Sequence, residues 1–247
     1  MAEKYKLEVK NLVKKFGDLL VLDDISFNVR ENEFLCIVGP TGCGKTTFLN
    51  SLSKLYDITS GEILINGEPV NLKKHNIAYI FQEYSNMPWL TIRQNVEFGL
   101  RIKRLPEDVI KERADYFLNM VGLMKFENYY PSQLSASMLQ RAAIARAFAV
   151  KPEVLLMDEP YGQLDIELRF RLEDELIKLW KEVGTTVIFI THNIEEAVYL
   201  SERILVLTNK PTKIKAEIKH DLPRPRDISD PQFVELRNQV TDLIKWW

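Results

Sequence analysis

The chain has 247 residues, of which 46% are hydrophobic and 28% are charged, and its formal net charge is −2. This length suits one large globular domain or a core with an inserted lobe. The slightly negative charge gives no overall basic field of the kind that favours nucleic acid. No apolar run approaches the roughly 18 residues that a membrane span needs, so if this protein works at a membrane, we expect another chain to cross it.

The N-terminal part is predicted to form an antiparallel layer of strands at the edge of the fold. Residues 7–9 and 25–29 alternate between apolar and polar side chains, as half-buried strands do, and residues 14–18 between them form a predicted turn. Residues 61–67 predict a further strand that ends in an Asn-Gly turn. The charged residues 1–10 lack the apolar core of a signal peptide, so we expect no such leader.

A glycine-rich segment lies between a predicted buried strand at 34–38 and a predicted helix at 47–52. It fits the phosphate-loop pattern G-x-x-x-x-G-K-[ST], in which glycines let backbone N–H groups point inward at an anion and the helix start adds partial positive charge. Lys45 can reach the terminal phosphates of a nucleotide, and the Thr46 hydroxyl can hold Mg²⁺. The residues expected to bind the nucleotide here are Gly39, Pro40, Thr41, Gly42, Cys43, Gly44, Lys45, Thr46 and Thr47.

The two cysteines, Cys36 and Cys43, lie in the predicted strand and in the loop, and we expect both to stay reduced, which suits a cytosolic chain. Two interpretations are open for Cys43. The start of the following helix lowers the pKa of a nearby thiol, which would make it reactive. The preferred interpretation is that Cys43 is a small residue that fills space.

Beyond the first strands, the pattern changes twice. Residues 77–81 predict an apolar strand that ends at Gln82, and residues 91–150 are helical in pattern, which we interpret as a lobe inserted between strands of the sheet. The remaining predicted elements are strands at 153–159, 186–190 and 203–207 and a helix at about 166–183. Strands that alternate with helices argue for a parallel sheet with right-handed crossovers.

Ligands of such sheets bind at the carboxyl ends of the strands. Asp158 follows a buried strand and can hold Mg²⁺ through water, opposite Thr46, and Glu159 is suited to act as general base for an attacking water. Structural roles, as a loop cap or as a partner for Lys45, are the alternatives. The residues at or just past predicted strand ends are Lys45, Gln82, Asp158, Glu159 and His192.

The C-terminal segment 229–247 predicts a helix that begins after Asp230, with Pro231 in its first turn. Its apolar residues recur every three or four positions, which favours a helix packed on the core. A subunit or membrane contact through Trp246 and Trp247 is the alternative.

Taken in chain order, the motif residues form one specific set: the loop 39–46, Gln82, the stretch 134–141 (Leu-Ser-Ala-Ser-Met-Leu-Gln-Arg), Asp158-Glu159, Leu164-Asp165 and His192. On these residues the chain resembles the ATP-binding subunit of ABC transporters over nearly its whole length. The resemblance implies an α/β fold with a P-loop NTPase core, a mixed sheet that is parallel at its centre, an antiparallel edge layer and an inserted helical lobe. The implied domains are a RecA-like core with the antiparallel layer at 1–90 and 151–228, a helical signature lobe at 91–150 and a C-terminal helix at 229–247.

The resemblance also implies how the nucleotide binds. Two subunits sandwich two ATP molecules, each between the phosphate loop of one chain and the signature of the other, and Mg²⁺ accompanies the ATP. Gln82 would sense the metal and the attacking water, and His192 would hydrogen-bond the γ-phosphate. Phe16 matches the residue that stacks on adenine, although a Phe packed under the first hairpin is an equal alternative. The remaining residues that the resemblance assigns to the nucleotide are Ser135, Ala136, Ser137 and Asp165.

Within the family, residues 81–83, 87–92 and 95–100, together with Met138, are most similar to the group that imports nitrate, taurine and sulfonates. This implies a peripheral subunit at the cytoplasmic face of the cell membrane. Its implied partners are a second ATPase subunit, transmembrane permease subunits and, indirectly, an extracytoplasmic substrate-binding protein. The alternatives are a soluble ABC-type ATPase that serves nucleic acid or a scaffold, and a small-molecule kinase, against which the signature and His192 argue.

The signature departs from the usual Leu-Ser-Gly-Gly, because Ala136 and Ser137 replace the glycines. A Cβ on each residue crowds the approach of the backbone N–H groups to the γ-phosphate. Either the chain tolerates this as a homodimer, or it pairs with a different ATPase and forms one weakened site. We favour the homodimer, because Glu159 and His192 are present.

Overall fold

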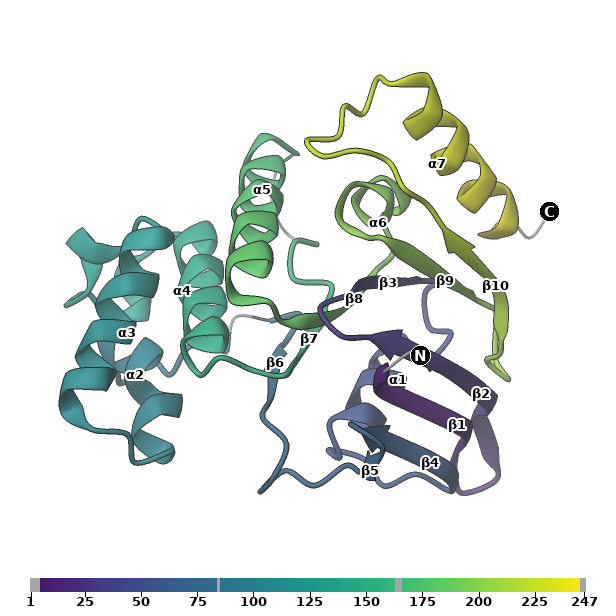
Figure 1. The fold of residues 1–247 in the computed structure, drawn as a ribbon, viewed down its shortest axis with the longest axis horizontal. Helices are drawn as coiled ribbons and strands as arrows, with labels where there is room; N and C mark the ends of the chain where they lie inside the picture. The colour runs from purple at the N-terminus through teal and green to yellow at the C-terminus, as the bar shows by residue number, and fades with distance from the viewer. Residues whose placement is uncertain (1–4, 84, 163–165, 245–247) are drawn as a thin grey trace. The chain divides into compact units, whose positions relative to one another are not determined.

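The computed structural model describes residues 5–83, 85–162 and 166–244. The chain divides into two compact units, Met1–His75 with Thr186–Trp247, and Asn76–Thr185. Their elements are labelled in Figure 1. Among the helices of the described residues, none combines the length and the apolar character needed to cross a membrane.

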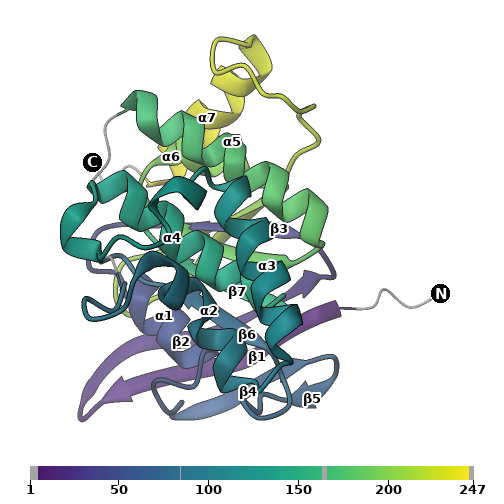
Figure 2. The ribbon, with the colours of Figure 1, turned by 90° about the vertical axis from the view of Figure 1, so that its left-hand side faces the viewer.

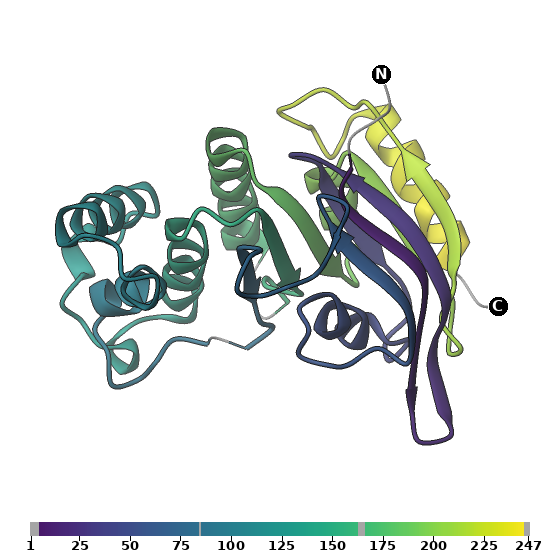
Figure 3. The ribbon, with the colours of Figure 1, turned by 60° about the horizontal axis from the view of Figure 1, so that its bottom comes forward.

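An antiparallel sheet forms the N-terminal part of the first unit. Its strands lie in the order β2-β1-β4-β5, with β1 at Tyr5–Phe16, β2 at Leu19–Arg30, β4 at Ser60–Ile65 and β5 at Glu68–Pro69. The predicted antiparallel layer is thereby confirmed, and β1 and β2 form a long hairpin (Figure 3). The predicted Asn-Gly turn joins β4 to β5, and both of its residues have positive φ, as a tight hairpin turn requires.

Strands β1 and β2 are longer than the strands predicted at 7–9 and 25–29. The pairing register shifts between Val9 and Leu12, and Asn11 between them has a φ of 48°. A bulge of this kind inserts a residue and interrupts the alternation of apolar and polar side chains. The sequence pattern therefore marks only part of each strand, and it places the turn too early.

The second sheet of this unit is mixed. Its strands β3 (Phe34–Val38), β8 (Thr186–Thr191) and β9 (Arg203–Leu207) are parallel and wholly buried, and β3 lies between the other two. A further strand, β10 (Ile214–Lys219), pairs antiparallel with β9 at the edge of the sheet. It was not predicted, although its apolar residues alternate with the exposed Lys215, Glu217 and Lys219, as in a half-buried edge strand.

The described residues of the first unit also form the helices α1 (Lys45–Leu52), α6 (Ile194–Leu200) and α7 (Pro231–Ile244). Helix α7 packs on α6 and β9 through the buried side chains of Phe233, Leu236 and Val240. Asp230 caps its first turn by accepting a hydrogen bond from the backbone N–H of Gln232 at 2.8 Å. These contacts support the helix packed on the core; Trp246 and Trp247 lie outside the described residues.

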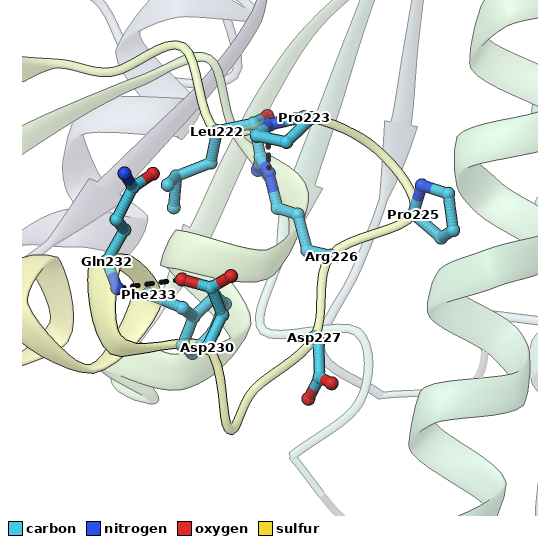
Figure 4. A pocket seen from close by; sticks show the side chains of 8 residues that line it. All are labelled: Leu222, Pro223, Pro225, Arg226, Asp227, Asp230, Gln232 and Phe233. Atoms are coloured by element: carbon cyan, nitrogen blue, oxygen red, sulfur yellow. Dashed lines mark hydrogen bonds between the residues drawn. The ribbon is translucent and has the colours of Figure 1, made fainter.

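The segment between β10 and α7 is held against the end of α6. Arg226 donates hydrogen bonds from Nη1 to the carbonyls of Val198, Tyr199 and Ser201 at 2.6–2.8 Å, and Arg224 donates to the carbonyl of Tyr199 at 3.1 Å. Two guanidinium groups thus satisfy carbonyls that a helix C-terminus leaves open. Figure 4 shows a small pocket that is lined in part by Arg226. None of the motif residues lines this pocket.

The second unit contains two parallel strands, β6 (Ile77–Ile80) and β7 (Val154–Asp158). Three helices, α2 (Ile92–Ile102), α3 (Glu107–Met120) and α4 (Ala136–Ala149), pack on one another as the predicted helical region (Figure 2). Helix α5 (Ile166–Val183) also packs on α4 and has the predicted bounds. The predicted α/β class, with a mixed sheet and an antiparallel layer, is confirmed.

Candidate functional site

The glycine-rich loop connects the buried strand β3 to helix α1, as predicted, although the helix begins at Lys45 rather than at residue 47. Gly42 and Gly44 have φ values of 76° and 113°, a region that L side chains rarely adopt. Where residues with positive φ alternate with residues with negative φ, successive backbone N–H groups point to the same side. These N–H groups then line a concave surface that binds anions. The loop therefore has the backbone of a phosphate site.

Both ends of the loop also lack room for a side chain. A Cβ on Gly44 would lie 2.9 Å from Cγ1 of Val21, and a Cβ on Gly39 would lie 3.0 Å from Cβ of Leu207. The loop thus packs closely against β2 at Gly44 and against the end of β9 at Gly39. Packing therefore disfavours a side chain at both positions, and at Gly44 the positive φ favours glycine as well.

Lys45 is nearly buried, with 5% of its surface exposed, and its Nζ donates to the carbonyls of Gly39 at 3.0 Å and Pro40 at 3.1 Å. Its ammonium group therefore lies across the loop, where an incoming phosphate would meet it. Thr46, the predicted Mg²⁺ ligand, is exposed at the same helix start.

Cys43 is buried, with 1% of its surface exposed. Burial raises the pKa of its thiol, and this outweighs the opposing effect of the Lys45 charge. The interpretation in which the helix start lowers this pKa is therefore wrong, because the side chain points into the protein and is desolvated. Cys43 fills space beneath the loop, and Cys36 is likewise a buried free thiol.

His192 reaches the same edge of the sheet as the phosphate loop. Val38 of β3 pairs in parallel with Thr191 of β8, so the residues that follow these two strands emerge side by side. The Oγ1 of Thr191 accepts a hydrogen bond from the backbone N–H of Asn193 at 2.9 Å, and Asn193 caps α6 by accepting from the N–H of Glu195 at 3.0 Å. His192 is exposed, and these hydrogen bonds hold its two neighbours, Thr191 and Asn193, in place.

Phe16 ends β1 and is 43% exposed, so it is not a core residue packed under the hairpin. The Phe16 and Tyr56 rings form a T-shaped pair with a centroid distance of 5.5 Å, and the Nζ of Lys14 lies 4.5 Å from the Phe16 centroid. An exposed ring held by its neighbours can stack on a planar base.

The second unit brings together the carboxylates and Gln82. Ile80 of β6 pairs with Met157 of β7, so Asp158, the last residue of β7, and Gln82, two residues after β6, lie at the same ends of adjacent parallel strands. Asp158 is 4% exposed, and its Oδ2 accepts a hydrogen bond from the Tyr79 hydroxyl at 3.4 Å. Gln82 itself is exposed.

Glu159 has a φ of 43°, which is unusual for a residue with a side chain. Its carbonyl accepts a hydrogen bond from the N–H of Gly162 at 3.2 Å, so a tight turn follows β7 directly. Backbone strain of this kind is found at functional sites, where the surrounding structure fixes a side chain in a useful direction.

The signature residues start helix α4 in the second unit. Ser135 is the N-cap, and its Oγ accepts a hydrogen bond from the N–H of Met138 at 3.4 Å and lies 3.1 Å from the Oγ of Ser137. Ser135 and Ala136 are exposed. The helix start thus presents its N–H groups and a hydroxyl at the surface, as an anion site requires. Asp165 lies outside the described residues.

The structure therefore places the predicted residues in two groups. The phosphate loop, Phe16 and His192 belong to the first unit, and Gln82, Asp158, Glu159 and the signature belong to the second. Three contacts were not anticipated: Tyr79 on Asp158, the Lys14 and Tyr56 side chains on Phe16, and Thr212 on the phosphate loop. Only Tyr79 carried a signal, since it lies in the predicted strand at 77–81.

Comparison with known proteins matches residues 22–162 to the ABC transporter family. Over 246 residues the chain is 46% identical to an uncharacterized ABC transporter ATP-binding protein of Methanocaldococcus jannaschii, covering 98% of this chain and 92% of that protein. It is 39% identical over 237 residues to the aliphatic sulfonates import ATP-binding protein SsuB of Bacillus cereus (96% and 93% covered). It is 37% identical over 252 residues to the nitrate import ATP-binding protein NrtD of Synechocystis sp. (97% and 95% covered).

Solved structures agree with the sequence comparison. The fold matches cbiO1 of Clostridium perfringens, part of the ABC transporter complex cbiONQ, with a TM-score of 0.79, 28% identity, and 88% of this chain and 89% of that chain covered. It also matches the dimeric post-hydrolysis structure of an ATP-binding cassette bound to ADP and Pi, with a TM-score of 0.76, 33% identity, and 86% and 98% covered. The chain therefore belongs to the ABC transporter family as an ATP-hydrolysing, ATP-binding subunit similar to the nitrate and sulfonate group.

Proposed function

We propose that this chain binds and hydrolyses MgATP to drive the import of a small anion through separate permease subunits. The observation that carries the proposal is the phosphate loop at the start of α1, with Lys45 lying across it. The import role is supported by two relatives whose names describe the import of aliphatic sulfonates and of nitrate. Nitrate and sulfonates are both oxyanions, so we propose that the transported molecule is a small oxyanion.

In this proposal the triphosphate binds to the backbone N–H groups of 39–47, and Lys45 exchanges its contacts with loop carbonyls for the β- and γ-phosphates. Adenine stacks on the exposed ring of Phe16. Thr46, Gln82 and Asp158 would hold Mg²⁺, since hydroxyl, amide and carboxylate oxygens suit this hard cation together with phosphate oxygens. The bound metal would neutralise charge on the phosphates.

Hydrolysis needs a base beside the γ-phosphate. Glu159 accepts a proton from water as the water oxygen attacks the γ-phosphorus, and the bond from that phosphorus to the bridging oxygen breaks, so the electron pair leaves with ADP. His192 donates a hydrogen bond to the γ-phosphate. Asp165 contributes to the same site in the proposed dimer.

The second half of each site comes from another subunit. We propose a homodimer in which Ser135, Ala136 and Ser137 of one copy face the γ-phosphate held by the phosphate loop of the other. The dimeric ADP- and Pi-bound relative supports this arrangement. A heterodimer with one weakened site is the alternative that the substitutions in the signature leave open. We propose that the dimer works at the cytoplasmic face of the membrane, on a permease supplied by an extracytoplasmic binding protein.

The test is phosphate release from ATP by the purified chain with no acceptor present, before and after addition of the permease that co-purifies from solubilised membranes. We expect turnover that Lys45→Ala abolishes, and uptake of a sulfonate or nitrate by vesicles that contain the permease and binding protein. Failure to bind MgATP would overturn the whole proposal. Recovery of the chain only with cytosolic partners or nucleic acid would overturn the transport role.

A further inference from the structure

Thr212, in the connection between β9 and β10, touches the phosphate loop directly. Its side chain is completely buried, and its Oγ1 donates a hydrogen bond to the carbonyl oxygen of Cys43. The two residues are far apart in the sequence. The contact therefore brings a C-terminal hairpin to the loop, and no motif of the chain includes it.

The backbone of Thr212 is fixed on both sides by strand β2. Its N–H donates to the carbonyl of Val21 at 2.9 Å, and its carbonyl accepts from the N–H of Asp23 at 2.9 Å. These bonds dock the tip of the hairpin on β2 (Figure 3). Thr212 thus lies beside Val21, whose side chain limits the space at Gly44.

The hairpin tip is itself closed by short contacts. The N–H of Thr208 donates to the carbonyl of Lys213 at 2.9 Å, and the N–H of Lys213 donates to the Oγ1 of Thr208 at 2.8 Å. The Nζ of Lys213 also pairs with Asp23 of β2 at 3.0 Å. The hydroxyl of Thr212 is therefore presented from a structured turn.

The direction of one peptide follows from this contact. In a trans peptide the C=O and the following N–H point in opposite directions. Because the carbonyl of Cys43 is held toward Thr212, the N–H of Gly44 points away from Thr212. Gly44 immediately precedes Lys45, so this N–H is among the donors of the phosphate site.

We infer that Thr212 is a positioning residue for the phosphate loop: its hydroxyl sets the direction of the peptide between Cys43 and Gly44 and thereby the affinity for nucleotide phosphates. The inference rests on the proposed function, because it assumes that the loop binds MgATP. It assigns a role in nucleotide affinity to the hairpin between β9 and β10.

Two variants separate the hydroxyl from the shape of the side chain. Thr212→Val keeps the shape and removes the hydroxyl, whereas Thr212→Ser keeps the hydroxyl. Binding of MgADP and MgATP is measured by calorimetry, beside thermal unfolding without nucleotide. We expect Thr212→Val to bind about tenfold more weakly, the effect of one lost hydrogen bond, and Thr212→Ser to bind within about twofold of the original.

Thr185→Val is the matched control. The Oγ1 of Thr185 is buried and donates to the carbonyl of Pro152 at 3.1 Å in the other unit, so this variant also loses a buried hydrogen bond to a carbonyl. We expect it to lower the unfolding temperature and to leave nucleotide affinity unchanged. If Thr212→Val behaves in the same way, Thr212 is merely structural and the inference is wrong.

If Thr212→Val does not yield folded protein, Thr212→Cys replaces it, because a thiol is a weaker donor of similar size. Weaker nucleotide binding is again expected, and unchanged affinity again overturns the inference. An original chain that binds no MgATP overturns the proposed function, whereas an original chain and a Thr212→Val variant that bind equally well overturn only the role of Thr212.

Discussion

Val38 of β3 and Thr191 of β8 are paired in parallel register, so the phosphate loop and His192 leave the sheet at one edge. The same relation holds in the second unit, where Ile80 pairs with Met157, Asp158 follows Met157, and Gln82 lies two residues after Ile80. Parallel pairing without a shift brings residues from distant parts of the sequence to equivalent positions. Groups that act on one phosphate can therefore be supplied by separate strands.

Glu159→Gln should abolish steady-state ATP hydrolysis while leaving MgATP binding within about twofold, because the amide keeps the shape of the side chain and loses the base. Phosphate release and calorimetry measure the two effects, and light scattering should show a dimer that persists in ATP. Glu167→Gln, which removes one exposed partner of Arg171, is the control and should behave like the original chain. Undiminished hydrolysis by Glu159→Gln would assign the base to another group.

Replacing both Ala136 and Ser137 by glycine should raise ATP turnover, since two Cβ atoms are removed from the exposed start of α4. The unfolding temperature should fall slightly, because glycine in a helix is less stable than alanine by about 0.5–1 kcal/mol per residue. The measurement is turnover by the enzyme coupled to its permease. Ala136→Ser retains a Cβ and should not raise it; no rise in the double glycine variant would remove the crowding argument.

Cys43 should react slowly with thiol reagents in the folded protein, because its side chain is buried and burial raises its pKa. The rate of labelling by iodoacetamide at pH 7.5 (about one unit below the ordinary thiol pKa), followed by mass spectrometry, should rise sharply in urea. Cys36→Ala isolates the signal of Cys43. Rapid labelling of the native protein, blocked by MgATP, would instead support a reactive thiol at the phosphate loop.

Stability should fall as pH decreases from about 6.5 toward about 4 because of His220. Burial, together with the charges of Arg226 and Arg224, lowers the pKa of His220 to about 4. Over this range the unfolded chain takes up a proton that the folded chain excludes, so unfolding becomes more favourable as pH falls. His220→Gln removes the titrating group and keeps a nitrogen near Ser201, whose Oγ lies 3.4 Å from Nε2 of His220.

The measurement is urea unfolding of both proteins at several pH values between 7 and 4.5, a range that spans the ordinary pKa of histidine. As pH falls, the unfolding free energy of the original chain should decrease more than that of His220→Gln. Parallel curves for the two proteins would show that His220 is protonated equally in the folded and unfolded states.

Much of this protein is determined locally by its sequence. The phosphate loop could be predicted because its glycines, its lysine and the flanking apolar run are contiguous, and helix α5 was predicted between the strands at 153–159 and 186–190. The resemblance carried by Gln82, Asp158, Glu159 and His192 extended this to the family, because their order along the chain is itself specific.

Tertiary structure decided what depends on distant segments. Strand β10 forms because β9 supplies its hydrogen-bond partners, and the pKa of Cys43 is raised because its side chain is buried. Thr212 meets the phosphate loop only once the hairpin of β9 and β10 docks on β2. A contact between residues so far apart has no periodicity or spacing to mark it, because it is created by the packing of elements rather than by neighbours in the chain.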